Sequence, residues 1–270
     1  MKDIDVYTIE IEQAREERLI SNPLNWFSLA GLFPLADGIN RLGKSEEFDI
    51  TLPALPQDAR AEFEVRGDDV YLTSASAGFT INGQPPTVDQ LRKDIDGDPD
   101  LVENASIAIR VIQRNGRPYL RVWDRESSAL KNFSGLRYFT VDPVHCVEGE
   151  FVPYDPPRAI RIADAIGGEH EILFPGEARF TLRGVACVLV AEYDEDELLF
   201  NFTDLTRADA TYPGGRYLLT EKPVGNHITL DFNLTRNWPC AYTQFATCPL
   251  PPTENHLMVR VEAGEKRYYH

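Results

Sequence analysis

Short runs rich in β-branched and aromatic residues recur through most of the chain, and Gly, Asn, Asp or Pro interrupts them about every ten residues. Two of the interruptions, Asn82-Gly83 and Asn115-Gly116, are dipeptides typical of tight β-hairpin turns. This rhythm is typical of β-sandwiches and β-barrels, whose strands are short and joined by turns. It predicts an all-β fold class with little helix.

One segment departs from this pattern. Residues 10–20 are rich in Glu, Gln, Ala, Arg and Leu, which favour helix, and the following Ser-Asn-Pro ends the segment. Short β-rich runs then continue to a polar stretch at residues 125–134, after which a second series begins. We therefore predict an N-terminal helix within residues 1–24, a β-sandwich over residues 25–130, and a larger β-barrel or sandwich over residues 131–270 that carries the candidate site.

Prolines and glycines subdivide the second β-rich region. We predict separate strands at residues 146–154 and 158–163, and again at 169–174 and 177–182, because Pro-Pro and Pro-Gly pairs separate them. The alternation of apolar and polar residues also predicts a strand near the end of the chain, at residues 258–262.

The charge balance limits the partners. The 27 Lys and Arg residues against 43 Asp and Glu residues give a formal net charge of -16, which opposes binding to a nucleic-acid backbone or an anionic membrane surface. The chain begins without a basic, apolar leader, and no apolar run reaches the roughly 18 residues of a membrane span. Four cysteines are too few for a disulfide framework. We expect a cytoplasmic protein with neither nucleic-acid nor membrane partners.

The first β-rich region contains two stretches of a known type. Residues 40–53 read NRLGKSEEFDITLP and residues 79–83 read FTING. They resemble the loop, strand and Asn-Gly turn of forkhead-associated domains, which implies a β-sandwich whose loops bind phosphothreonine. Lys44 stands at the position of the phosphate-facing Arg, and Asp58 lies where a Ser and a His would be expected. Lys lacks the bidentate fork and a carboxylate repels phosphate, so we expect the sandwich without phosphothreonine binding.

Longer blocks of the chain resemble a bacterial and archaeal family known as domain of unknown function 1684. The matching blocks are NWFSLAGLF at 25–33, FSGLRYF at 133–139, FTDLT at 202–206, TYPGGRYL at 211–218, DFN at 231–233, PCAY at 239–242, ATCPLPPTEN at 246–255 and AGEK at 263–266. The family has no assigned activity, so this resemblance implies no chemistry.

Polar residues gather at strand ends and in proline-stiffened loops between residues 202 and 266, where rigid scaffolds usually carry their sites. The ligand-binding candidates are Asp204, Thr211, Tyr212, Arg216, Asp231, Asn233, Cys240, Cys248, Glu254, Asn255, Glu265 and Lys266. Their side chains either meet a ligand or satisfy the backbone groups of a buried irregular loop.

The favoured function is binding of a small polar or anionic ligand in a pocket of the second β domain. Arg216 follows Pro213-Gly214-Gly215, so the backbone can approach a ligand closely while the guanidinium binds a carboxylate or phosphate. Lys266 would add a second positive group. The alternative for Arg216 is an internal ion pair with Asp204 or Asp231, because a buried Arg needs a carboxylate.

Two other functions stay open, and so does the question of whether the protein is an enzyme. A hydrolase or transferase would use the region of Asp231, Cys240 and Glu265, with the thiol as nucleophile, and needs these groups and Arg216 to converge within about 8 Å. The third option is a structural or protein-interaction module with a protein partner.

A metal site is the last alternative. Cys240, Cys248 and His256 are evenly spaced, and Asp231 or His270 would supply a fourth ligand, but the close cysteine pair of structural zinc sites is missing. We predict no metal, and no cofactor is indicated. The sequence leaves open whether Cys240 and Cys248 are thiols, a disulfide or metal ligands.

Overall fold

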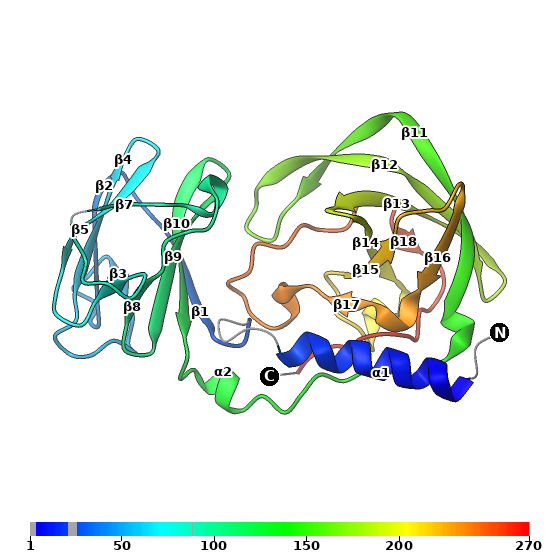
Figure 1. The fold of residues 1–270 in the computed structure, drawn as a ribbon, viewed down its shortest axis with the longest axis horizontal. Coiled ribbons are helices and arrows are strands. Elements are labelled where there is room, and N and C mark those ends of the chain that lie inside the picture. Colours follow the sequence, from blue (N-terminus) through cyan, green and yellow to red (C-terminus); the bar gives the residue numbers. More distant parts are fainter. Residues whose placement is uncertain (1–3, 21–25, 88, 270) are drawn as a thin grey trace. The chain divides into compact units, whose positions relative to one another are not determined.

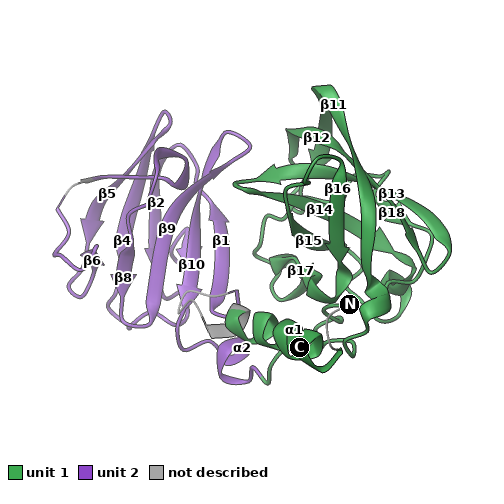
Figure 2. Ribbon diagram, turned by 45° about the vertical axis from the view of Figure 1, so that its right-hand side comes forward, with its two compact units in different colours: residues 1–22, 134–270 green, residues 23–133 purple. Residues whose placement is uncertain are grey.

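The computed structural model describes residues 4–20, 26–87 and 89–269. Strands are the predominant secondary structure of the described chain, and one long helix, α1 (Ile4–Ile20), lies near its N-terminus (Figure 1). The predicted all-β fold class is therefore confirmed. The chain divides into two compact units, one of residues 23–133 and one of residues 1–22 with 134–270 (Figure 2).

The unit of residues 23–133 is a sandwich of two sheets. The first sheet has the order β1 (Leu29–Pro34), β10 (Arg117–Asp124), β9 (Ile107–Arg114), β8 (Val102–Asn104) and β6 (Thr80–Ile81). The second has the order β3 (Ile50–Thr51), β2 (Gly38–Gly43), β4 (Ala61–Arg66), β5 (Asp69–Ala75) and β7 (Asp89–Leu91). Phe63 and Leu72 of one sheet and Ile109 and Leu120 of the other share one buried core, as alternating inward residues of a sandwich do. The short helices η1 (Asp94–Asp96) and α2 (Ser128–Lys131) complete the unit.

The predicted Asn-Gly turns are present in this unit. Asn82 and Asn115 have φ of 50° and 52°, and Gly83 and Gly116 follow with φ of 77° and 71°. Two successive positive φ values match the right-handed twist of the flanking strands, which is why Asn-Gly is favoured there. The second turn brings Arg114 opposite Arg117 and so joins β9 to β10.

The unit that holds residues 134–270 is built on a single long sheet. Its order is β16 (His227–Asp231), β11 (Cys146–Ala163), β12 (Glu169–Leu182), β13 (Val185–Asp194), β14 (Glu197–Asp204), β15 (Arg216–Glu221) and β17 (Arg236–Asn237), with β18 (His256–Leu257) beside β14. Four short helices connect the strands: η2 (Pro143–His145), η3 (Leu205–Ala208), η4 (Phe232–Leu234) and η5 (Pro239–Ala241). Phe200, Phe202, Leu218 and Phe232 lie in the core that the sheet encloses. No strand pairing among the described residues joins β16 to β17, so the sheet is open.

Two predicted strand divisions and one predicted strand in this unit are wrong. The separate strands at 146–154 and 158–163 are the continuous β11, and those at 169–174 and 177–182 are the continuous β12. The prolines are accommodated by an irregularity in which residues 154–157 oppose Pro175 alone, so the hairpin bends without ending. The segment at 258–262 is not a strand: its Val261 carbonyl accepts from the Arg216 guanidinium, and its Val259 carbonyl accepts from the Leu205 backbone N–H.

Helix α1 begins at Ile4, earlier than the predicted residue 10, and the predicted stop at residues 21–23 lies outside the described residues. It is held by hydrogen bonds to residues 134–270 of the same unit. The Tyr7 hydroxyl donates to Asp231 Oδ2 (2.7 Å), and Arg15 donates to the carbonyl groups of Asn233 (3.0 Å) and Phe139 (3.2 Å). Among the described residues, no helix combines the length and the apolar character needed to cross a membrane.

Candidate functional site

The guanidinium of Arg216 lies in the interior of the unit that holds residues 134–270, where its side chain is 1% exposed. Nη2 donates to Asp204 Oδ2 (3.0 Å) and to the Val261 carbonyl (2.9 Å). Nη1 donates to the carbonyl groups of Ala263 (2.6 Å) and Glu265 (3.0 Å). Burial lowers the pKa of Arg216, and the neighbouring Asp204 carboxylate opposes that effect. Of the two alternatives for Arg216, the structure shows the internal ion pair; the expected contact with a ligand is corrected, because no ligand can reach the buried guanidinium.

Asp204 and Thr211 belong to the same buried region. Asp204 Oδ1 accepts from the backbone N–H groups of Thr206 (2.8 Å) and Val261 (3.0 Å), so this carboxylate caps η3 and also holds the C-terminal segment. The Thr211 and Thr206 hydroxyl groups are hydrogen-bonded to each other at 2.8 Å. These polar groups satisfy the irregular backbone that follows β14.

Glu265 is fully buried, and its carboxylate accepts from the Asn237 backbone N–H (3.1 Å), the Asn237 side-chain amide (2.8 Å) and the Tyr242 hydroxyl. The preceding Gly264 has φ of 70°, and a Cβ there would lie 2.5 Å from the Thr235 carbonyl oxygen. Only glycine therefore lets the chain pass Thr235 closely enough to bring Glu265 inside. We call Asp204, Arg216 and Glu265, with their hydrogen-bond partners, the buried polar network.

Asp231 and Asn233 hold helix α1. Asp231 Oδ2 accepts from Tyr7, while Oδ1 accepts from both the backbone N–H and the side-chain amide of Asn233 (3.0 Å each). The Asn233 amide also donates to the Tyr7 oxygen (2.9 Å). Burial, together with the Asp231 carboxylate, raises the pKa of Tyr7. Both predicted ligand-binding residues are thus used for helix docking.

Asn255, Glu254 and Lys266 lie in three different environments. Asn255 is fully buried, and its side chain bonds to the Val190 N–H (2.8 Å), the Val190 carbonyl (2.9 Å) and the Asn201 carbonyl (2.8 Å), bridging β13 and β14. Glu254 is exposed and forms an ion pair with Arg158. The Lys266 ammonium lies 4.8 Å from the centre of the Phe139 ring.

Cys240, Cys248 and Tyr212 are neighbours. The Cys240 backbone N–H donates to Cys248 Sγ (3.3 Å), and burial together with these two cysteines raises the pKa of Tyr212. The structure holds Cys146, Cys187, Cys240 and Cys248 as thiols. Within the described residues no three His, Cys, Asp or Glu side chains are grouped closely enough to hold a metal ion. His270, which was considered as a ligand, lies outside the described residues.

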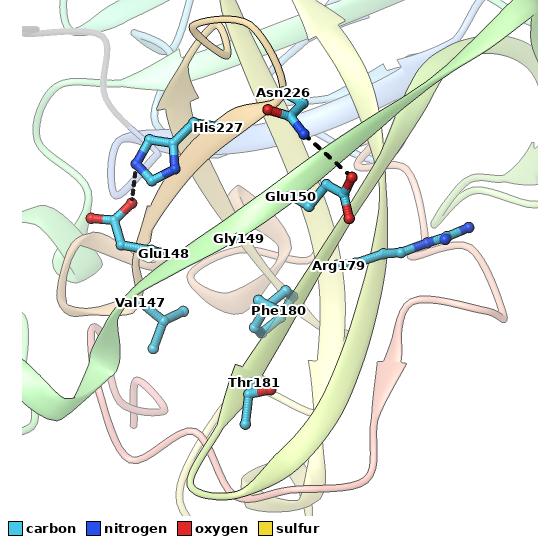
Figure 3. A pocket seen from close by; sticks show the side chains of 9 residues that line it. All are labelled: Val147, Glu148, Gly149, Glu150, Arg179, Phe180, Thr181, Asn226 and His227. Atoms are coloured by element: carbon cyan, nitrogen blue, oxygen red, sulfur yellow. Dashed lines mark hydrogen bonds and ion pairs between the residues drawn. The ribbon is translucent and has the colours of Figure 1, made fainter.

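One pocket, of about 580 Å³, lies over β11, β12 and β16 (Figure 3). Its polar side chains pair with one another: His227 Nε2 lies 2.8 Å from Glu148 Oε2, and the Asn226 amide donates to Glu150 (3.3 Å). Figure 3 shows Arg179 pointing away from the pair of His227 and Glu148. Two carboxylates in an exposed groove make this pocket unsuited to an anion.

A second pocket, of about 420 Å³, lies where β14 ends beside β18. We call it the His256 groove; it is lined by Thr203, Arg207, Pro213, Gly214, Leu250, Pro251, Pro252, Thr253 and His256. Thr203 Oγ1 lies 2.7 Å from His256 Nδ1. Arg207 is exposed and forms no ion pair with any residue that the structure describes. None of the lining residues is acidic.

Gly215, beside this groove, was predicted to let the backbone approach a ligand, but it has a different role. Gly215 has φ of 103°, and a Cβ there would lie 2.4 Å from Pro251 Cγ. The close approach that this glycine permits is therefore to the proline wall of the groove itself, not to a ligand. The sequence prediction missed Thr203 and Arg207, and named His256 as a possible metal ligand.

Lys266 lines a third pocket, of about 260 Å³, with Arg137, Arg267 and two tyrosines. The Arg137 and Arg267 guanidinium groups lie 4.8 Å and 5.9 Å from the centre of the Tyr269 ring. Its cations are thus already stacked on aromatic rings, unlike Arg207. The predicted candidates do not meet in one pocket: Arg216 and Glu265 share the buried polar network, Asp231 holds α1, and Cys240 pairs with Cys248.

The family model described as "Protein of unknown function (DUF1684)" matches residues 131–266. The chain belongs to this family. It is 35% identical to an uncharacterized protein of Haloarcula marismortui with a solution NMR structure; the match covers 50% of this chain and 78% of that chain, with a TM-score of 0.42. No curated protein matches the chain.

The span that matches the DUF1684 model includes both the buried polar network and the His256 groove, and it excludes Tyr7 and Arg15 of α1. It also leaves out the sandwich of residues 23–133, whose resemblance to forkhead-associated domains stays a prediction.

Proposed function

We propose that the His256 groove binds a small molecule through a carboxylate or phosphate group. The lining supplies one guanidinium, one imidazole and two hydroxyl groups, from Arg207, His256, Thr203 and Thr253. Leu250 and three prolines form the remaining walls. A concave, largely apolar site with a few convergent polar groups is typical of small-molecule binding, and the volume of about 420 Å³ is in the usual range.

The absence of acidic residues from the lining carries this proposal. Acidic residues outnumber basic ones by 43 to 27 in the whole chain, yet none of them lines this groove. An anion would meet an otherwise repulsive surface field, and this lining removes the repulsion locally. Arg207 has no carboxylate partner among the described residues, so its planar donors are available to a ligand carboxylate or phosphate.

The test is calorimetric titration of the full chain with inorganic phosphate and with citrate, in the wild type and in Arg207→Ala. Loss of a charged hydrogen-bond donor costs about 1.5 to 3 kcal/mol, so we expect affinity to fall by about tenfold to a hundredfold. Arg161→Ala is the matched control, because it removes an exposed guanidinium of the same unit outside the groove. Equal affinities for the wild type and Arg207→Ala would contradict the proposal, as would no binding of either probe.

One observation favours a hydrolase or transferase as the second candidate. Asp231, Cys240 and Glu265 do not form its active site, because each is bonded to a different set of internal partners. Thr203 and His256, in contrast, place a hydroxyl within 2.7 Å of an imidazole nitrogen, as a nucleophile and its general base require. Hydrolysis of a nitrophenyl acetate or phosphate by the wild type, abolished in Thr203→Val, would identify this activity.

A further inference from the structure

The Cys240 and Cys248 thiols already lie side by side in the folded protein. The Cys240 N–H donates to Cys248 Sγ at 3.3 Å. Cys240 Sγ lies 4.0 Å from the carbonyl oxygen of Ala246, inside the loop that joins the two cysteines. The two sulfur atoms are therefore neighbours before any reaction takes place.

The backbone on both sides of this thiol pair is held in place. The Cys248 carbonyl accepts from the Ala165 N–H (2.9 Å), and the Leu250 N–H donates to the Ala163 carbonyl (2.8 Å), which ties the end of the loop to the tip of the β11–β12 hairpin. Cys240 itself lies within η5, whose Ala241 N–H donates to the Trp238 carbonyl (2.9 Å). A fixed backbone keeps the sulfur atoms adjacent, so little reorganisation is needed to join them.

The four cysteines differ in what surrounds them. The hydrogen bond from Cys248 lowers the pKa of Cys240, whereas burial raises the pKa of Cys146 to about 11 and also raises that of Cys187. Cys240 is partly exposed, while Cys248 is 8% exposed. Because the thiolate is the reactive form, Cys240 is the thiol that meets an external reagent first.

We propose that Cys240 and Cys248 form a redox-modification site that closes to an intramolecular disulfide by exchange with a small-molecule disulfide. Cys240 thiolate attacks one sulfur of the reagent, breaks its S–S bond and releases one thiolate. Cys248, after losing its proton to solvent, then attacks Cys240 Sγ, forms the protein S–S bond and releases the second thiolate. The two protein thiols are oxidised by two electrons, and one disulfide molecule is reduced to two thiols. The site does not depend on the ligand proposed for the His256 groove.

The test is incubation of the full chain with oxidised glutathione, followed by intact-mass measurement and peptide mapping. The wild type should lose the mass of two hydrogens, and the map should link Cys240 to Cys248; reduction with dithiothreitol should restore the original mass. In Cys248→Ala the reaction should stop at a glutathione adduct on Cys240, because the resolving thiol is missing. The double variant Cys146→Ser/Cys187→Ala is the control and should form the same internal link.

The wild-type measurement decides the proposal even if a variant does not fold. A glutathione adduct that persists on the wild type, a disulfide-linked dimer, an unchanged mass, or a link through Cys146 or Cys187 would each overturn it.

Discussion

Thr203 and Asp204 are neighbours at the end of β14, yet their side chains belong to two regions that use polar groups differently. Asp204 faces the buried polar network, where its carboxylate is bonded to Arg216 and to two backbone N–H groups. Thr203 lines the His256 groove, where Arg207 has no carboxylate partner among the described residues. The alternation of a strand places one residue inward and the next outward.

An Arg in a polar motif is therefore not by itself a sign of ligand binding. Arg216 has the more suggestive sequence context, after Pro213-Gly214-Gly215, but both of its terminal nitrogens bond to internal acceptors. Arg207 has no such context, and its guanidinium forms no ion pair with any described residue. Whether the protein itself supplies the acceptors is what separates a structural guanidinium from a binding one.

The largest expected effect separates these two arginines. Arg216→Ala removes the buried countercharge of Asp204 and the guanidinium donors to Asp204 Oδ2 and three carbonyl groups, so we expect the free energy of unfolding to fall by about 3 to 5 kcal/mol. Arg207→Ala should change it by less than about 0.5 kcal/mol, because Arg207 is exposed. Urea denaturation of both variants measures the difference. Similar losses in the two variants would remove the distinction between the regions.

The fold could be predicted from local signals, and most of the buried polar network could not. Turn residues and alternation identified the all-β class and the Asn-Gly hairpins, because both signals are encoded by a few adjacent residues. The segment at 258–262 has the alternation of a strand, but the Val261 carbonyl accepts from Arg216 instead of a neighbouring strand. Every residue has a backbone carbonyl group, so the residue types could not show which carbonyl groups accept the hydrogen bonds of Arg216.

The docking of α1 was hidden for a different reason. Tyr7 and Asp231 are 224 residues apart in the sequence, and nothing in the sequence near Tyr7 indicates a partner so far along the chain. The His256 groove was closer to being predictable, because the period of two along β14 puts Thr203 on the face opposite Asp204. Its other lining residues come from loops whose paths only the folded chain defines.

A smaller effect is expected at Asn255, the buried residue that precedes His256 of the groove. Its side chain bonds to Val190 and Asn201, and its carbonyl accepts from the Thr203 N–H (2.9 Å) immediately before His256. Asn255→Ala leaves buried strand groups without partners, so we expect a loss of about 2 to 3 kcal/mol in the free energy of unfolding. Phosphate affinity should fall as well, because the groove wall loses its anchor.

Asn226→Ala is the control for that experiment, since Asn226 is an exposed asparagine outside the His256 groove. It should leave both the unfolding free energy and phosphate affinity unchanged within about 0.5 kcal/mol. If Asn255→Ala lowered stability without lowering affinity, phosphate binding in the groove would not depend on this anchor.

The smallest expected effect concerns Glu192, whose carboxyl group lacks the hydrogen-bond donors that surround Asp204. Burial raises the pKa of Glu192 to about 7, and its Oε1 has no hydrogen-bond partner within the described part of the chain. The unfolded chain releases this proton near pH 4.5, whereas the folded protein keeps it to about pH 7. The contribution of Glu192 to the free energy of unfolding is therefore largest below pH 4.5, and it is lost as the pH rises toward 7.

Glu192→Gln removes the ionisation, so the variant should be more stable than the wild type at pH 8 by about 1 to 2 kcal/mol and equally stable at pH 4. The measurement is urea denaturation of both proteins across this range.

Burial also lowers the pKa of His145, which destabilises the fold in acid, but this contribution is common to both proteins and cancels in their difference. Glu197→Gln, which changes an exposed carboxyl group on β14, should follow the wild type at every pH. If the curves for Glu192→Gln and the wild type were parallel, Glu192 would be solvated or paired in the folded protein. The contrast between partnered and unpartnered buried carboxyl groups would then not hold.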